Sequence, residues 1–193
     1  MTDELLALFS ADKREHANQS KLNTPEYRAM RARDLARRER VMELIGAEAP
    51  STAEDYYHAA WIMNHGDTPD DARRAHQLAL RASELGYRPA RWLAAASYDR
   101  WRMYLGKPQK YGTNYLFDGR KDRLWDVDPR TTDKERAAWG VPPLAEQLRK
   151  AAEANRRQVP LTAAEAEAYE ASAPEWAKAA LRKWQIEDGD SLT

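Results

Sequence analysis

Helix-start signals recur along this sequence at short intervals, and they constrain its fold more than any other feature. Each signal places a capping Ser or Thr at the start of a helical run, often with proline in the first turn. The signals lie at Thr24-Pro25, Ser51-Thr52, Thr68-Pro69, Thr132–Glu135 and Thr162–Glu165. The links between the predicted helices are only a few residues long, which favours antiparallel pairs. We therefore predict a mainly α fold, a bundle of antiparallel helix hairpins.

The predicted helices cover most of the chain outside one central stretch. They lie at residues 2–22, 24–45, 51–64, 68–85, 88–104, 132–140 and 143–157, followed by one from Thr162 and one from Pro174 to Gln185. Gly46 and Gly86 are the expected stops. Residues 106–130 lack helical periodicity, and the turn dipeptide Asp118-Gly119 predicts a small β-hairpin in an ordered loop.

We expect one helical domain over residues 1–193. It divides into N-terminal helices at 1–46, a core at 51–147 that carries the site, and peripheral C-terminal helices at 148–193. Trp176, Leu181 and Trp184 are expected to dock the C-terminal helices. A small-molecule site from Leu161 onward is disfavoured.

Composition excludes several classes of function. The chain has no cysteine, which excludes disulfides, zinc–thiolate sites and thiol nucleophiles. Its 31 basic residues balance 31 acidic residues, so the net charge favours neither nucleic acid nor an acidic membrane. No run approaches the roughly 18 apolar residues of a membrane span, and the acidic start does not resemble a secretory leader. We expect a cytoplasmic protein.

Aromatic and arginine residues are unevenly used. The chain has 7 Trp and 9 Tyr but only 2 Phe, so rings with a polar tip predominate. Such rings suit a half-buried pocket, or they fill gaps between alanine-rich helices. The segment 24–45 is rich in arginine, which a solvated helix face explains most simply. A nucleic-acid-binding accessory role is a second alternative that local charge alone supports weakly.

The histidines do not predict a metal site by their spacing. His58 and His65 share a helix face but lie roughly 10 Å apart along the axis, which is too far for one ion. We therefore expect no metal and no cofactor. His65 stands at a helix end beside Asp67, and an imidazole next to a carboxylate is a reasonable acid–base pair. Alternatively, His65 interacts with the last helix carbonyls while Asp67 forms the turn.

Asp99 interrupts an apolar stripe of the helix at 88–104, on the same face as Trp92 and Met103. A buried carboxylate needs a partner, and we consider His65, Tyr111 or an arginine of the long loop, either in a functional site or in a structural network. The following loop offers Gln109, Tyr111 and Thr113 as recognition groups.

Two resemblances add to this interpretation. The segment DDARRAHQLALRASELGYRPARWLAAASYDR resembles one tetratricopeptide-type helical hairpin, whereas a solenoid needs about three repeats. The segments AAWIMNHGD, YDRWRMYLGKPQKYGTN and WDVDPRTTDKERAAWGVPPLAEQ resemble the signatures of an uncharacterised bacterial helical family. That resemblance implies no reaction. It implies candidate positions at His65, Asp67, Asp99, Arg100, Gln109, Tyr111 and Thr113.

The leading hypothesis is a metal-independent enzyme that acts on a small polar substrate in a tryptophan-rich pocket of a helical bundle. The catalytic candidates are His65, Asp99 and Tyr111, expected around one hollow. The substrate-binding candidates are Asp67, Arg100, Gln109 and Thr113, with Trp61, Trp92 and Trp101 as walls. The alternative is a non-catalytic, helical-repeat-like module that binds a protein partner.

Overall fold

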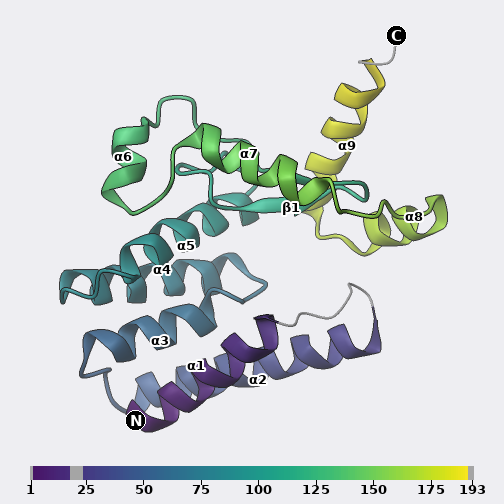
Figure 1. Cartoon of the computed structure of the whole chain (residues 1–193). Coiled ribbons are helices and arrows are strands. Elements are labelled where there is room, and N and C mark those ends of the chain that lie inside the picture. Colours follow the sequence, from purple (N-terminus) through teal and green to yellow (C-terminus); the bar gives the residue numbers. More distant parts are fainter. Residues whose placement is uncertain (1, 18–23, 191–193) are drawn as a thin grey trace. The chain divides into compact units, whose positions relative to one another are not determined.

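A computed structural model describes residues 2–17 and 24–190, and it confirms a mainly α fold (Figure 1). The elements are α1 (Thr2–Ala17), α2 (Pro25–Ala47), α3 (Ala53–Met63), α4 (Pro69–Glu84), α5 (Ala90–Tyr104), β1 (Tyr115–Phe117), β2 (Asp122–Leu124), α6 (Asp133–Ala138), α7 (Leu144–Asn155), α8 (Ala163–Ser172) and α9 (Glu175–Asp190). The part of the first predicted helix at residues 18–22 lies outside the described residues.

Most helix starts follow from local capping. The hydroxyls of Thr24, Thr52, Thr68, Thr132 and Thr162 each accept a hydrogen bond from the backbone N–H three residues later. One predicted stop is wrong, because Gly46 lies inside α2, which continues to Ala47. Glycine lowers helix stability but does not end a helix whose neighbours are packed.

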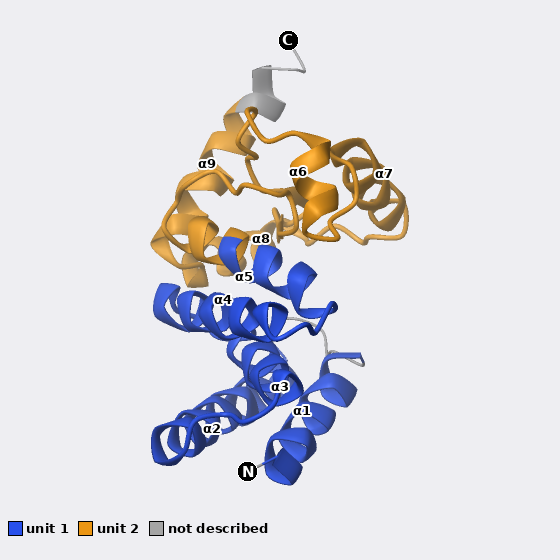
Figure 2. Ribbon diagram, turned by 90° about the vertical axis from the view of Figure 1, so that its left-hand side faces the viewer, with its two compact units in different colours: residues 1–98 blue, residues 99–193 orange. Residues whose placement is uncertain are grey.

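The chain forms two compact units, residues 1–98 and residues 99–193, coloured separately in Figure 2. The boundary falls within α5 and inside the stretch 51–147, which we expect from the sequence to form one core. Each unit is described by itself below.

Unit 1 is built around α3. Helices α1 and α2 pack against it, and α4 follows it as an antiparallel hairpin partner (Figure 1). The core contains the fully buried side chains of Leu5, Val41 and Ile62. The small residues Ala72, Ala75, Ala79 and Ala82 of α4 are buried. The α4 residue His76 hydrogen-bonds through Nδ1 to the carbonyl of Ala94 at 2.8 Å.

Unit 2 contains the predicted hairpin, with two strands of 3 residues each. Strands β1 and β2 are antiparallel, with Tyr115 opposite Leu124. The expected docking of the C-terminal segment is confirmed, because Leu181 and Trp184 of α9 are buried against Met103 and Trp125. Among the described residues, no helix combines the length and apolar character that crossing a membrane requires.

Candidate functional site

His65 lies in a tight turn between α3 and α4. The backbone N–H groups of His65 and Gly66 donate to the carbonyls of Ile62 and Met63, at 3.2 and 3.0 Å. A Cβ atom at Gly66 would lie 2.2 Å from Cβ of Asp71, so only glycine fits the turn. The turn holds the imidazole at the end of α3 with 16% of its side chain exposed.

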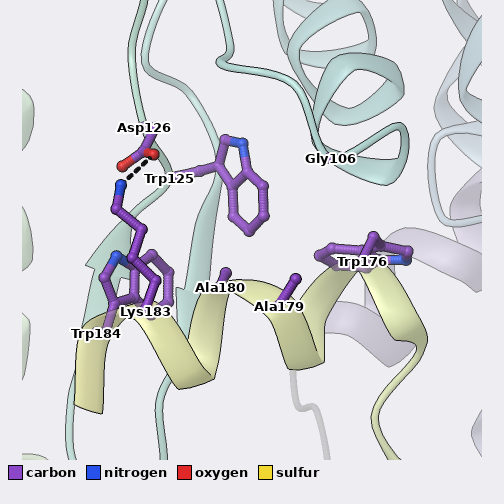
Figure 3. Close-up of a pocket in the computed structure, with 8 residues that line it drawn as sticks. All are labelled: Gly106, Trp125, Asp126, Trp176, Ala179, Ala180, Lys183 and Trp184. Carbon is purple, nitrogen blue, oxygen red and sulfur yellow. Dashed lines mark hydrogen bonds and ion pairs between the residues drawn. The ribbon is translucent and has the colours of Figure 1, made fainter. Parts of the chain in front are cut away.

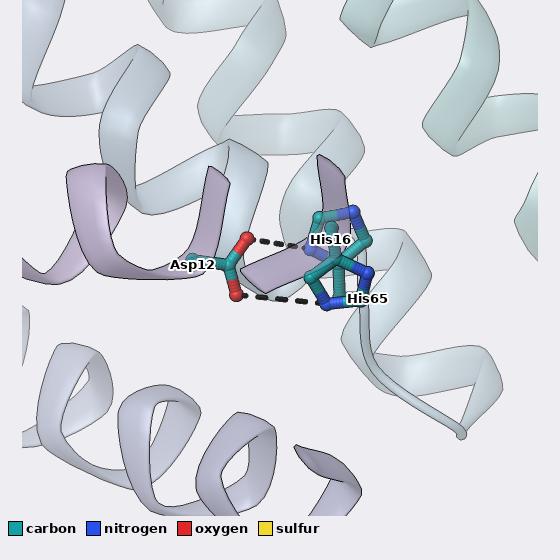
Figure 4. A group of neighbouring side chains, drawn as sticks. All are labelled: Asp12, His16 and His65. Atoms are coloured by element: carbon teal, nitrogen blue, oxygen red, sulfur yellow. Dashed lines mark hydrogen bonds and ion pairs between the residues drawn. The ribbon is translucent and has the colours of Figure 1, made fainter. Parts of the chain in front are cut away.

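The carboxylate partner of His65 is Asp12 of α1. Asp12 is fully buried, and its Oδ2 lies 2.8 Å from Nδ1 of His65 (Figure 4). The same oxygen accepts a hydrogen bond from Nε1 of Trp61 at 3.1 Å. A neutral His65 that carries its proton on Nδ1 donates it to this carboxylate, which fixes both tautomer and ring orientation.

A second carboxylate–imidazole pair lies beside the first. The rings of His16 and His65 stack with centroids 3.8 Å apart and planes inclined by 20°. Nε2 of His16 lies 3.2 Å from Oδ1 of Asp34, which belongs to α2. Burial raises the pKa of Asp34, but hydrogen bonds from His16 and Arg37 outweigh it and lower the pKa to about 2. Asp34 is therefore ionised at neutral pH.

Arginines of α2 neutralise these carboxylates. Arg37 is 9% exposed and contacts Asp34 at 2.5 Å, Glu15 at 2.6 Å and Asp12 at 3.2 Å. Arg31 pairs with Asp34 at 2.5 Å. The expectation of a solvated arginine face is therefore wrong for this part of α2, because burying the two aspartates requires cationic partners.

Asp67 does not pair with the imidazole of His65, so this predicted acid–base pair is wrong. Its carboxylate is 64% exposed and pairs with Arg31 and, at 3.4 Å, with Arg38. The same two arginines also donate to the carbonyl of His65, at 2.8 and 3.3 Å. Asp67 and the arginines thus hold the turn from outside.

Asp99 of unit 2 holds a loop rather than a side chain of another helix. Its carboxylate is fully buried and accepts hydrogen bonds from the backbone N–H groups of Lys110, Tyr111 and Thr113. Oγ1 of Thr113 donates a further bond of 2.8 Å. Burial raises the pKa of Asp99, and these bonds oppose the rise. Among the partners considered for Asp99, Tyr111 takes part through its backbone N–H group, so the contacts match a structural network.

The other polar groups of the predicted recognition loop also bind the loop itself. The fully buried amide of Gln109 donates to the carbonyls of Asn114 and Trp125, at 3.1 and 2.8 Å. The carbonyl of Tyr111 accepts bonds from Arg136 at 2.9 Å and Gln147 at 3.1 Å. These contacts fix the loop, and they correct the expectation that Gln109 faces a substrate.

The predicted wall and binding residues differ in their surroundings. Trp61 contacts the His65 ring edge to face, with centroids 5.7 Å apart. Trp92 is 40% exposed, unlike its buried stripe neighbours, and Trp101 is half-buried. The buried Nε of Arg100 has no hydrogen-bond partner among the described residues. The common hollow expected for His65, Asp99 and Tyr111 stays a prediction.

A tryptophan-lined hollow occurs in unit 2, between the central loop and α9 (Figure 3). Trp125, Trp176 and Trp184 line it, and Lys183 pairs with Asp126 at 2.6 Å at its edge. The Trp125 ring packs edge to face on the other two, with centroids 5.7 and 6.0 Å away. These rings chiefly pack α9 against the loop.

Sequence reasoning missed Asp12, His16 and Asp34. One signal was available, because Asp12 and His16 are four residues apart and therefore share a face of α1. Nothing in the local sequence marks their approach to His65. No family model, curated protein or solved structure matches the chain.

Proposed function

We propose that the protein is an enzyme that transfers protons to or from a small polar substrate at the Asp12–His65 pair of unit 1. The observation that carries the proposal is the 2.8 Å contact between Nδ1 of His65 and the fully buried Oδ2 of Asp12. A buried carboxylate that orients an imidazole is a common basis of general acid–base catalysis.

The surroundings of the pair support a reactive site. Both imidazoles reach the surface, with 16% and 17% of the His65 and His16 side chains exposed. Each buried charge costs desolvation energy. A cluster of two imidazoles and two carboxylates is therefore more than the stability of the fold requires. Clusters of this kind are more frequent at functional sites.

Two alternative functions account for fewer of the observed contacts than an enzyme does. A helix-hairpin interaction module accounts for the succession α3, α4 and α5 but not for the buried acids and histidines of unit 1. Nucleic-acid binding would need arginines free for phosphate, whereas Arg31, Arg33, Arg37, Arg38 and Arg40 all pair with carboxylates. The proposal includes two finer expectations: a place in the uncharacterised bacterial helical family, and a cytoplasmic location.

The test begins with native mass spectrometry of the purified protein, to find a retained small molecule and guide the choice of substrates. Small esters, amides and phosphate monoesters are then assayed with wild type, His65→Gln and His58→Gln. His58 is the matched control, because its Nδ1 makes no hydrogen bond with a described residue. We expect turnover to fall at least ~100-fold in His65→Gln and to persist in His58→Gln. Equal turnover in all three proteins would refute the proposal.

A further inference from the structure

We propose that Asp12, His16 and His65 bind one divalent transition-metal ion. Each offers one ligand atom, and these atoms all lie within 4.8 Å of one another. Two imidazoles and one carboxylate form a ligand set that suits zinc, cobalt or iron, and it leaves coordination positions for water or substrate.

An unsatisfied buried oxygen points to the ion's position. Oδ1 of Asp12 is fully buried and accepts no hydrogen bond from a described residue, although Nε of Arg37 lies 3.2 Å away. Buried carboxylate oxygens without a donor are rare. Nε2 of His16 lies 3.9 Å from this oxygen. That gap is too long for a hydrogen bond, but two metal–ligand bonds of about 2.1 Å span it.

Neighbouring side chains orient the proposed metal ligands. Trp61 donates to Oδ2 of Asp12 and so orients the carboxylate, as outer-shell donors do in metal sites. Oδ1 of Asp34 lies 3.2 Å from the same nitrogen of His16, which makes it a candidate for a fourth ligand. The three ligands come from α1 and from the turn after α3, so the ion would tie two segments of unit 1 together.

Binding requires two local changes. Nε2 of His16 must give up its hydrogen bond to Oδ1 of Asp34 so that its lone pair can face the ion. Because the imidazole planes are stacked and inclined by only 20°, their nitrogen lone pairs do not yet converge on one point. One of the two partly exposed rings must also rotate about its Cβ–Cγ bond. Arg37 adds positive charge beside the site, so binding depends on strong metal–nitrogen bonds. We therefore expect Zn²⁺ and Co²⁺ to bind, and Mg²⁺ and Ca²⁺, which prefer oxygen ligands, to bind much more weakly.

This inference rests on the proposed function for the place of the site and changes the role of His65. When an ion occupies the cluster, His65 is a ligand, and a metal-bound water becomes the group that gives or takes the proton.

The experiment titrates the metal-free full-length protein with Zn²⁺ by calorimetry and with Co²⁺ by visible absorption. We expect one ion per chain, with affinity at least ~100-fold weaker in His16→Ala and in His65→Ala. His58→Ala and His76→Ala are the matched controls, because they remove the other two histidines and should leave affinity unchanged. His16→Asn, at the partly exposed position, serves if an alanine variant does not fold by circular dichroism.

The outcomes separate the two proposals. Absence of stoichiometric binding, or equal affinity in the His16, His65 and control variants, overturns the metal site. If turnover is nevertheless lost in His65→Gln, the proposed enzyme stands without a metal. If the ion binds through His16 and His65 but no substrate is turned over, the metal site stands and the enzyme proposal fails.

Discussion

His65 and Asp12 are 53 positions apart in the sequence, and their side chains meet at 2.8 Å. The contact joins α1 to the turn after α3, so it is both a candidate reactive pair and a tertiary link of unit 1. Its energetic contribution can be measured apart from any activity.

Asp12→Ala should lower the free energy of unfolding of unit 1 by about 3 kcal/mol. The change removes the carboxylate that accepts hydrogen bonds from Trp61 and His65. It also removes one of the carboxylates that pair with the buried guanidinium of Arg37. Chemical denaturation followed by tryptophan fluorescence measures the effect. The control is Glu84→Ala, whose side chain is 64% exposed and should change stability by less than about 0.5 kcal/mol. Equal effects would show that the buried pair contributes no special stability.

Acid should destabilise the protein partly through Asp34. Its pKa is about 2 in the folded protein against an ordinary value of 3.8, so the ionised form stabilises the fold above pH 4. That stabilisation, about 2 kcal/mol, is lost as the pH falls from about 4 to about 2. The free energy of unfolding, measured by denaturation at several pH values between 2 and 6, should change less with pH for Asp34→Asn than for wild type. Identical pH slopes would contradict the assignment.

Asp99→Asn should destabilise unit 2 by about 2–4 kcal/mol. The asparagine amide would place an NH₂ group among the N–H donors of Lys110, Tyr111 and Thr113, so buried donors lose their acceptor. Thermal unfolding measures the loss, and Asp126→Asn, at a side chain 51% exposed, is the control. An Asp99→Asn variant with wild-type stability but no turnover would instead support the catalytic role that the sequence predicts for Asp99.

Gly66→Ala and Gly46→Ala should change stability in opposite directions. A Cβ at Gly66 meets the Asp71 side chain at 2.2 Å, so we expect a loss of about 2–4 kcal/mol and displacement of His65. A Cβ at Gly46, inside α2, meets nothing within 4 Å, and alanine should add about 0.5–1 kcal/mol through helix propensity. Thermal melts of both variants check the pair. Stabilisation by Gly66→Ala would show that the turn is not constrained as described.

The sequence determined the features that depend on neighbouring residues. The caps at Thr52, Thr68 and Thr132 bond to N–H groups three residues away, so a short stretch of sequence contains the whole interaction. The buried position of Asp99 also followed from its place on a helical stripe. Its partners did not, because they are backbone N–H groups, which nearly every residue has and no residue type marks.

Only the tertiary structure decided which distant groups meet. The packing of α1 and α2 against α3 brings Asp12, His16 and Asp34 close to His65. The same packing buries arginines of α2, which the composition of that segment led us to expect on a solvated face. Such contacts depend on the way helices pack around Leu5, Val41 and Ile62, whose apolar side chains specify burial but not which polar groups become neighbours. The chemistry of unit 1 is therefore a property of its packing and not of any one segment.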